Sequence, residues 1–412
     1  MTENAVQTET PVGWGPFTRL WLANAVSSFG DGVRYTALPL LAVTLTTDPF
    51  LLSLVTVAMA LPLLFSPIAG VLADSVDRRR LLITVDVSRA VVVVALALMV
   101  LTHTVNLVVV CVAAALLGLG EAVFMVASQS FLPEVAPPPM LTNANGRLHV
   151  AQLIFRDSAG MPAGGVLFVA LAALPFLLDS ASFVIGVVLL ATISTRTALP
   201  SRSDGVRPRW SKMVGEGARY LRDDRLLATL AVMLGVANFF VTAMGAVEVL
   251  YVVKWLDLPA GVFGVFLAAG ALGGIAGGLS SARIAARTGT FPSALVCLGL
   301  AGAAGLVMGL VAQPVVAAAC LAVFGFGTAV YQTLTVSFRQ ASAPPELLGR
   351  INGVYRLLGT GVSPLGALAA GALASAAGIQ MPYVLAGAGI LLLVVVAAGP
   401  VLRMASSRED AA

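Results

Sequence analysis

Long apolar runs separated by short polar loops make up most of the chain. Each run is close to the length of about 20 residues that a helix needs to cross the hydrocarbon core of a bilayer. The pattern predicts twelve membrane-spanning helices, at residues 20–45, 51–73, 81–101, 107–132, 149–170, 174–194, 226–252, 262–282, 293–311, 315–338, 351–374 and 383–402. The expected fold class is therefore all-α and integral to a membrane.

Composition and charge distribution support a membrane protein. The 412 residues are 58% hydrophobic and only 11% charged, against roughly 25% charged residues in soluble domains. Basic residues gather in every second loop, and Lys254 is the one exception in the opposite loops. The positive-inside rule then predicts a plasma-membrane protein with both termini in the cytoplasm. The net charge of +4 is spread over these short loops, which does not indicate a nucleic-acid partner.

The two halves of the chain repeat each other at an offset of 207 residues. Residues 118–124 (GLGEAVF) align with 325–331 (GFGTAVY), and the same offset carries Asn145 onto Asn352 and Gly164 onto Gly371. A parallel repeat of this length predicts two six-helix halves. The expected parts are a tail at 1–17, a first half at 18–195, a cytoplasmic loop at 196–225, a second half at 226–403 and a tail at 404–412. Residues 211–225 of the loop are able to form an amphipathic helix at the membrane surface.

A small-residue helix end runs into a charge cluster between the second and third spans, where residues 70–80 read GVLADSVDRRR. This segment resembles the loop signature of the major facilitator superfamily, and the twelve spans and the parallel repeat agree with that family. Segments 27–32, 178–183 and 349–353 resemble the branch that includes macrolide-efflux and siderophore-export proteins.

The resemblance implies that Asp74 locks one half against the other in one conformation. Ser75 and Asp77 depart from the family pattern, in which a basic residue and a glycine are usual. The gate candidates are Gly70, Asp74, Asp77, Arg78, Arg79, Arg80 and, in the eleventh span, Arg356. The alternative for the three consecutive arginines is that they only fix topology.

Ionisable residues inside apolar spans are the candidates for proton coupling or for lining a cavity, since burying them is costly unless they pair or meet water. Asp31 and Arg34 stand three apart and share a helix face, so either a structural ion pair or a proton or cation site is possible there. Glu121 and Glu248 have no basic residue within a turn. An isolated carboxyl at membrane depth takes up a proton easily, which suits proton exchange.

Other charges inside the spans are expected to be structural. Asp86 and Arg89 are interpreted as a local pair and Asp179 as a structural residue, whereas the partners of Arg156 and Asp157 stay open. Span five ends in a segment that resembles the antiporter motif of drug exporters, with Gly160, Pro162, Gly164 and Gly165. Small residues of this kind permit close helix contact.

We therefore predict a secondary active exporter of amphipathic small molecules, drugs or siderophore-like metabolites, that works as a monomer by alternating access and proton antiport. The alternatives are an uptake symporter for a small metabolite and a transport-inactive membrane sensor or scaffold. Cys111, Cys297 and Cys320 have no paired spacing. No metal, cofactor or enzymatic activity is expected, because neither a nucleophile with its base nor a metal-ligand constellation is evident.

Overall fold

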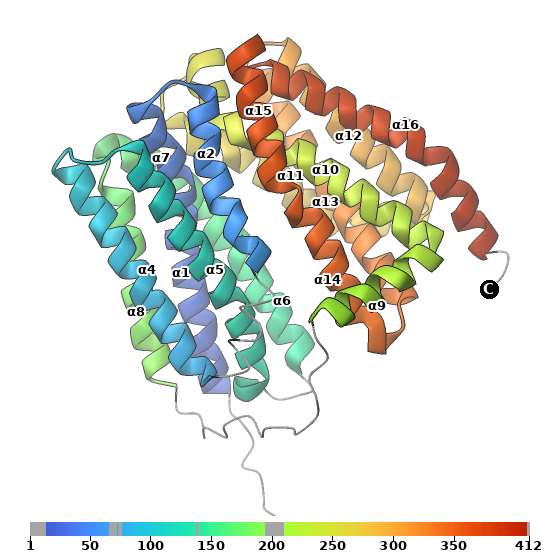
Figure 1. The fold of residues 1–412 in the computed structure, drawn as a ribbon, viewed down its shortest axis with the longest axis horizontal. Coiled ribbons are helices and arrows are strands. Elements are labelled where there is room, and N and C mark those ends of the chain that lie inside the picture. The colour runs from blue at the N-terminus through green and yellow to red at the C-terminus, as the bar shows by residue number, and fades with distance from the viewer. Residues whose placement is uncertain (1–13, 66–71, 73–75, 137–139, 194–209, 410–412) are drawn as a thin grey trace, which may run out of the picture.

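The computed structural model describes residues 14–65, 72, 76–136, 140–193 and 210–409, and every regular element within them is a helix (Figure 1). The helices are α1 (Trp14–Leu45), α2 (Pro49–Ala60), η1 (Leu61–Phe65), α4 (Arg78–Leu101), α5 (Leu107–Val135), α6 (Leu141–Ala151), η3 (Gln152–Gly160), α7 (Met161–Ala170), α8 (Leu174–Ala191), α9 (Trp210–Asp223), α10 (Arg225–Leu250), η4 (Tyr251–Trp255), α11 (Val262–Thr288), α12 (Thr290–Leu310), α13 (Pro314–Ser342), α14 (Pro345–Gly361), α15 (Ser363–Ala377) and α16 (Met381–Glu409). The all-α prediction is confirmed for this part of the chain.

Ten helical segments of the described chain are long and apolar enough to cross a membrane, which confirms the third to the twelfth predicted spans. The first predicted span is the 32-residue helix α1, which carries Asp31 and Arg34 inside its apolar sequence. The second begins as α2 and η1, and part of its predicted length lies outside the described residues. The total of twelve spans therefore stays a prediction.

Helix boundaries repeat at the offset that the sequence predicted. Helices α5 and α13 both have 29 residues, and each boundary of α13 lies 207 positions after that of α5. Helix α7 ends at Ala170 and α15 at Ala377, which is again a separation of 207 residues. These helix boundaries therefore follow the sequence repeat in both halves.

Besides the 3-10 segment η1 in the second span and the break at Val362 in the eleventh, two π-helical segments depart from the predicted spans. Residues 152–160 form the π-helical segment η3 inside the fifth span, and residues 251–255 form the π-helical segment η4 at the end of the seventh. Periodicity alone did not predict them, because one extra residue in a turn hardly changes an apolar pattern. Such segments occur frequently at functional sites.

Helices α1 to α8 form one group and α10 to α16 a second, and the two groups meet at the top of Figure 1. Helix α2 packs against α15, and α7 packs against α11. At the same end, Ser375 of α15 donates a hydrogen bond of 3.1 Å to the carboxylate of Asp48, which also caps α2. Helix α9 lies toward the opposite end of the bundle. The amphipathic helix predicted at residues 211–225 is confirmed as α9.

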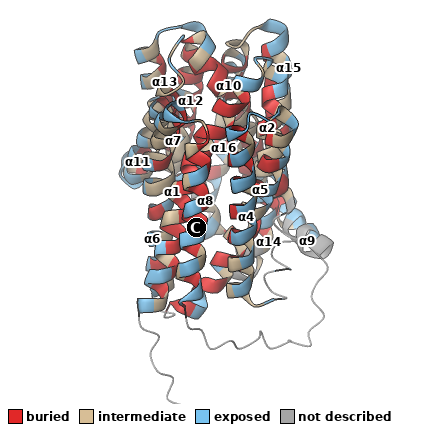
Figure 2. Ribbon diagram, turned by 90° about the vertical axis from the view of Figure 1, so that its left-hand side faces the viewer, coloured by how far each residue is buried: buried red, intermediate tan, exposed pale blue. Residues whose placement is uncertain are grey.

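Buried residues lie between the helices, and exposed residues face outward around the bundle (Figure 2). Many exposed side chains are large and apolar, among them Val91, Val108, Leu279 and Val395, each more than half exposed. Hydrocarbon is a favourable environment for such side chains and water is not. The bundle is therefore that of a multi-pass membrane protein.

Candidate functional site

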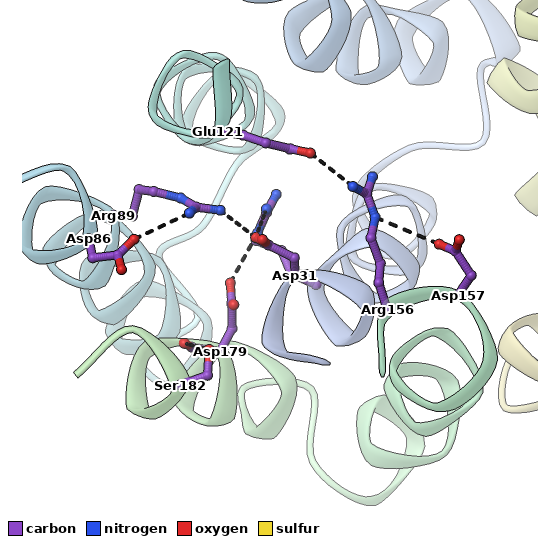
Figure 3. Close-up of polar contacts among 9 residues, drawn as sticks. Asp31, Asp86, Arg89, Glu121, Arg156, Asp157, Asp179 and Ser182 are labelled. Carbon is purple, nitrogen blue, oxygen red and sulfur yellow. Dashed lines mark hydrogen bonds and ion pairs between the residues drawn. The ribbon is translucent and has the colours of Figure 1, made fainter. Parts of the chain in front are cut away.

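Three spans of the first group contribute to one buried ion-pair network. Arg34 of α1 contacts Asp31 at 2.6 Å and Asp179 of α8 at 3.0 Å. Arg89 of α4 reaches the same Asp31 oxygen at 2.5 Å and Asp86 at 3.4 Å. All five residues are at most 8% exposed. Asp31 thus lies between two guanidinium groups, and the network joins α1, α4 and α8 (Figure 3).

Two glycines make room for this network, and neither was among the site residues that the sequence indicated. A β-carbon on Gly30 would lie 2.6 Å from the Asp179 carboxylate and 2.8 Å from the β-carbon of Ser182. A β-carbon on Gly120 would lie 2.7 Å from the side chain of Arg89. Only glycine allows the helices to approach this closely while the charged side chains stay in contact.

A second ion pair lies beside the buried network and is more accessible. Arg156 of η3 contacts Glu121 of α5 at 3.0 Å, and these side chains are 25% and 20% exposed. The Arg156 guanidinium also lies 4.2 Å from the ring centre of Tyr35 and 3.8 Å from Asp157. Glu121 is therefore not the isolated carboxyl that the sequence suggested. Its partner is 35 residues away and reaches it only through helix packing.

The charges of the network do not balance. Asp31, Asp86, Glu121, Asp157 and Asp179 supply five carboxyl groups, whereas Arg34, Arg89 and Arg156 supply three guanidinium groups. One oxygen of Asp86 and one of Asp179 are buried with no hydrogen-bond partner among the described residues. An excess of carboxyl groups in a low-dielectric interior attracts positive charge. The arrangement is therefore suited to binding and releasing protons or cations.

Glu248 does not join this network. It lies near the end of α10, in the second group of helices, and it forms no ion pair with any described residue. Electrostatic interactions link it to Tyr251 and Tyr383, whose side chains are almost fully buried. The sequence-based expectation of a carboxyl without a basic neighbour holds at this position in the tertiary structure.

Among the gate candidates, Gly70 and Asp74 lie outside the described residues. Asp77 caps α4 by accepting a hydrogen bond of 2.9 Å from the backbone N–H of Arg80. Arg78 pairs with Glu134 at 2.5 Å, and Arg79 donates to the carbonyl oxygens of Leu190 and Ala191 at the end of α8.

These contacts tie α4 to α5 and α8 within one group of helices. Arg356 behaves differently, because its guanidinium donates to the sulfur of Met125 in the other group at 3.8 Å. Arg356 therefore has a contact between the two groups of helices.

The antiporter-like segment lies where α7 packs between α1 and α11. A β-carbon on Gly160 would lie 2.6 Å from the carbonyl oxygen of Phe29, and one on Gly164 would lie 3.0 Å from the side chain of Thr36, both in α1. A β-carbon on Gly165 would instead lie 3.0 Å from the backbone of Gly261 and Gly264.

The side of α7 that bears Gly165 therefore contacts the other group of helices. Pro162 also lies close to Gly264 of α11. A β-carbon added to Gly264 would lie 2.9 Å from the α-carbon of Pro162. The four residues keep backbones close both within the first group and between the groups.

Within the described residues, no group of three or more His, Cys, Asp and Glu side chains is arranged to hold a metal ion. The three cysteines are unpaired thiols.

Two packed groups of apolar helices with charges buried among them agree with a membrane transporter of the major facilitator type. A family model described as "Transmembrane secretion effector" matches residues 7–412. The chain belongs to this family of the major facilitator superfamily.

Curated relatives align over nearly the whole chain. The multidrug efflux pump Tap of Mycolicibacterium fortuitum is 29% identical over 397 residues, which cover 93% of this chain and 95% of the relative. The enterobactin exporter EntS of Shigella boydii is 28% identical over 399 residues, which cover 92% of this chain and 91% of the relative. The resemblance to efflux and siderophore-export proteins is thereby confirmed.

Solved structures share the fold at lower identity. A bacterial homologue of the iron transporter ferroportin in its inward-facing state has a TM-score of 0.73 and 18% identity, with 92% of this chain and 97% of that chain covered. The outward-facing state of a bacterial ferroportin homologue has a TM-score of 0.61 and 18% identity, with 95% of this chain and 99% of that chain covered. The nucleoside transporter NupG has a TM-score of 0.77 at 13% identity, with 94% and 99% covered.

Proposed function

We propose that this transporter exports amphipathic small molecules across the plasma membrane in exchange for protons, by alternating access of its two groups of helices, and that it acts as a monomer. Export is supported by the family match and by relatives named as a multidrug efflux pump and an enterobactin exporter. The basic loops at one end favour both termini in the cytoplasm. The substrate would bind between the groups near the middle of the membrane, as in other transporters of this architecture.

The observation that carries proton exchange is the partly exposed pair of Arg156 and Glu121 beside a dry ion-pair network. A water-accessible carboxylate can take up a proton, whereas the groups around Arg34 are shielded from water. Electrostatic interaction between Asp31 and Arg156 connects the accessible pair to the buried network. We assign Glu121 as the proton acceptor and Arg156 as the cation that it releases on protonation.

The path from this pair to the contact between the groups is short. Arg156 lies in η3, which continues directly into α7, and the backbone of Gly165 in α7 approaches Gly261 and Gly264 of α11. Loss of the Glu121 charge would free Arg156 and change the forces on η3. We propose that this change loosens the packing of α7 on α11 and so couples protonation to reopening at that end.

Respiring everted membrane vesicles test this function. Their lumen is acidic and corresponds to the cell exterior, so an antiporter should accumulate its substrate inside and release protons. A panel of macrolides, siderophores and lipophilic cations is added while a pH-sensitive dye reports the proton gradient. We expect some compounds to dissipate the gradient in vesicles with the protein and not in vesicles without it.

In the Glu121→Gln variant, the rate of substrate-induced proton release should fall at least about tenfold. Asp257→Asn, at an exposed outer-loop carboxyl, should behave as the unchanged protein. Accumulation that survives collapse of the proton gradient would contradict antiport, and movement of substrate out of the vesicles would favour the uptake symporter.

A further inference from the structure

Glu248 is a carboxyl whose role the proposed proton exchange does not explain. It is the one acidic residue of α10, a helix of 26 residues that begins at Arg225, and it lies two residues before the end of that helix. Its side chain is partly exposed, and no described Lys or Arg pairs with it. A carboxylate in a low-dielectric setting without a cation is costly, so a bound proton or cation would stabilise it.

Two tyrosines provide a rigid wall next to this carboxyl. The rings of Tyr251 and Tyr383 stack with centres 4.2 Å apart, and the Tyr251 hydroxyl donates to the carbonyl oxygen of Met308 at 2.9 Å. The Tyr383 hydroxyl is buried and has no hydrogen-bond partner among the described residues. Leaving a buried hydroxyl unpaired costs about 1–3 kcal/mol. Electrostatic interaction links this phenol to Glu248, so the unpaired hydroxyl and the carboxyl lie near each other.

The helix face that bears Glu248 is open one turn earlier. Gly245 lies three residues before Glu248 and therefore on the same side of α10. It is exposed, and a β-carbon added to it would have no atom within 4 Å. Helix α10 also contacts α1 and α2 of the other group. The side of α10 that bears Gly245 and Glu248 is therefore accessible from outside the packed interior.

We propose that Glu248, assisted by Tyr383, binds the positive charge of the transported molecule, which makes amphipathic organic cations the preferred substrate class. This inference rests on the proposed export function. A resident metal ion is disfavoured because the described residues around Glu248 supply no group of three ligands, and hard divalent ions take about six oxygen ligands. An organic cation needs one carboxylate and an apolar wall, and both are present at this position.

The positive charge at Glu248 could also be a proton. In that case neutralising Glu248 would abolish proton release and leave the binding of an organic cation intact. If Glu248 binds the substrate, the same change weakens the binding of cations and spares the binding of neutral compounds. Comparing the binding of a cation with that of a neutral compound of similar size therefore shows whether the positive charge at Glu248 is a proton or the substrate.

Equilibrium dialysis of the purified full-length protein in nanodiscs measures this directly, with tetraphenylphosphonium as the cation and triphenylphosphine oxide as the neutral compound. We expect Glu248→Gln to weaken tetraphenylphosphonium binding at least tenfold and to change triphenylphosphine oxide binding less than twofold. Glu248→Asp should retain most of the affinity, and Tyr383→Phe should lose roughly threefold to tenfold through the missing hydroxyl. Asp257→Asn is the matched neutralised carboxyl and should bind both probes normally.

Elution as a single monodisperse species and an unchanged thermal midpoint establish that each variant is folded. The inference is overturned if folded Glu248→Gln binds tetraphenylphosphonium as tightly as the unchanged protein, or if the unchanged protein does not bind this cation. It is also overturned if the variant loses only proton release. Failure of the export proposal would look different, because Glu248-dependent cation binding would persist while vesicles showed no proton-driven accumulation.

Discussion

The two groups of helices share a repeat but differ in the charge that they bury. The first holds three arginines and five carboxyl groups in two adjacent sets of ion pairs, whereas Glu248 of the second forms no ion pair with a described residue. The residues 207 positions after Asp31, Arg34, Asp86, Arg89 and Glu121 are Asn238, Val241, Ser293, Val296 and Thr328.

Because the second group forms a comparable helix bundle without these charges, the fold does not require the network. Buried ion pairs are also weak sources of stability, since desolvation offsets most of their attraction. We propose from this difference that the network serves transport rather than folding. We propose a division of labour in which the first group exchanges protons and the second selects the substrate by charge.

Removing Arg34 should give the largest effect, since it would leave Asp31 and Asp179 buried with less positive charge. Breaking a buried pair in this way costs about 3–5 kcal/mol, so Arg34→Met should greatly lower the yield and the thermal midpoint of purified protein. Arg34→Lys keeps the charge but not the two-pronged contact, and should recover part of the loss. Val241→Ala, at the equivalent position of the second group, should shift the midpoint far less. Equal losses at the two positions would refute the asymmetry.

Crowding the contact between the groups should give the next largest effect. A β-carbon on Gly264 would collide with the backbone of Met161 and Pro162, so Gly264→Ala must separate α11 from α7, at a cost of about 1–3 kcal/mol. We expect transport in vesicles to fall at least tenfold while helix content by circular dichroism is kept. Gly278→Ala lies in the same helix with no atom within 4 Å of the new carbon, and should be neutral or stabilising by roughly 0.5–1 kcal/mol. Normal transport by Gly264→Ala would show that this contact does not move with the cycle.

The separate roles of Glu121 and Glu248 can be tested with a double-mutant cycle. Glu121→Gln should lower the maximal rate of proton-driven transport about tenfold with little change in the half-saturating concentration. Glu248→Gln should raise that concentration about tenfold for a cation, a change of about 1.4 kcal/mol. Independent sites predict that the two effects add in free energy within about 0.5 kcal/mol in the combined variant. A combined variant no worse than either single variant would indicate one shared site.

The smallest effects should come from helix caps, which the two groups have in common. Asp77 caps α4 and Asp224 caps α10 through hydrogen bonds to backbone N–H groups. Replacement of either by Ala should cost about 1 kcal/mol, and replacement by Asn should restore most of it, as measured by thermal unfolding in detergent. The Asp224 variant should lose somewhat more, because Asp224 also pairs with Arg408 at 2.8 Å. If an Asp77→Ala variant folded normally but failed to transport, Asp77 would have the gating role that the family pattern implies.

Local chemistry made several site features predictable. The pairing of Asp31 with Arg34 and of Asp86 with Arg89 follows from helical spacing and is confirmed at 2.6 and 3.4 Å. The cap at Asp77 is a further local feature, because an aspartate directly before a helix is a standard N-cap. The sequence interpretation instead treated Asp77 as a gate residue on the strength of the family pattern.

Contacts between spans were not predictable in this way. Arg89 reaches Asp31 across 58 positions, and Arg34 reaches Asp179 across 145. The rotation of each helix about its axis decides which side chains face one another, and apolar residues on all sides leave that rotation undetermined. For the same reason, Asp179 could be read only as structural and Glu121 only as isolated.

The sequence by itself determined the membrane-spanning character, the positions of ten spans and the repeat of 207 residues. These features depend on hydrophobicity and spacing along the chain, which helix formation in hydrocarbon preserves. Tertiary structure alone decided that Asp31 lies between two arginines, that Glu121 has a partner in Arg156, and that Glu248 has no ion-pair partner among the described residues. Those outcomes depend on helix rotation and on glycines that allow close approach, because a charge at membrane depth takes its chemistry from the helices packed around it.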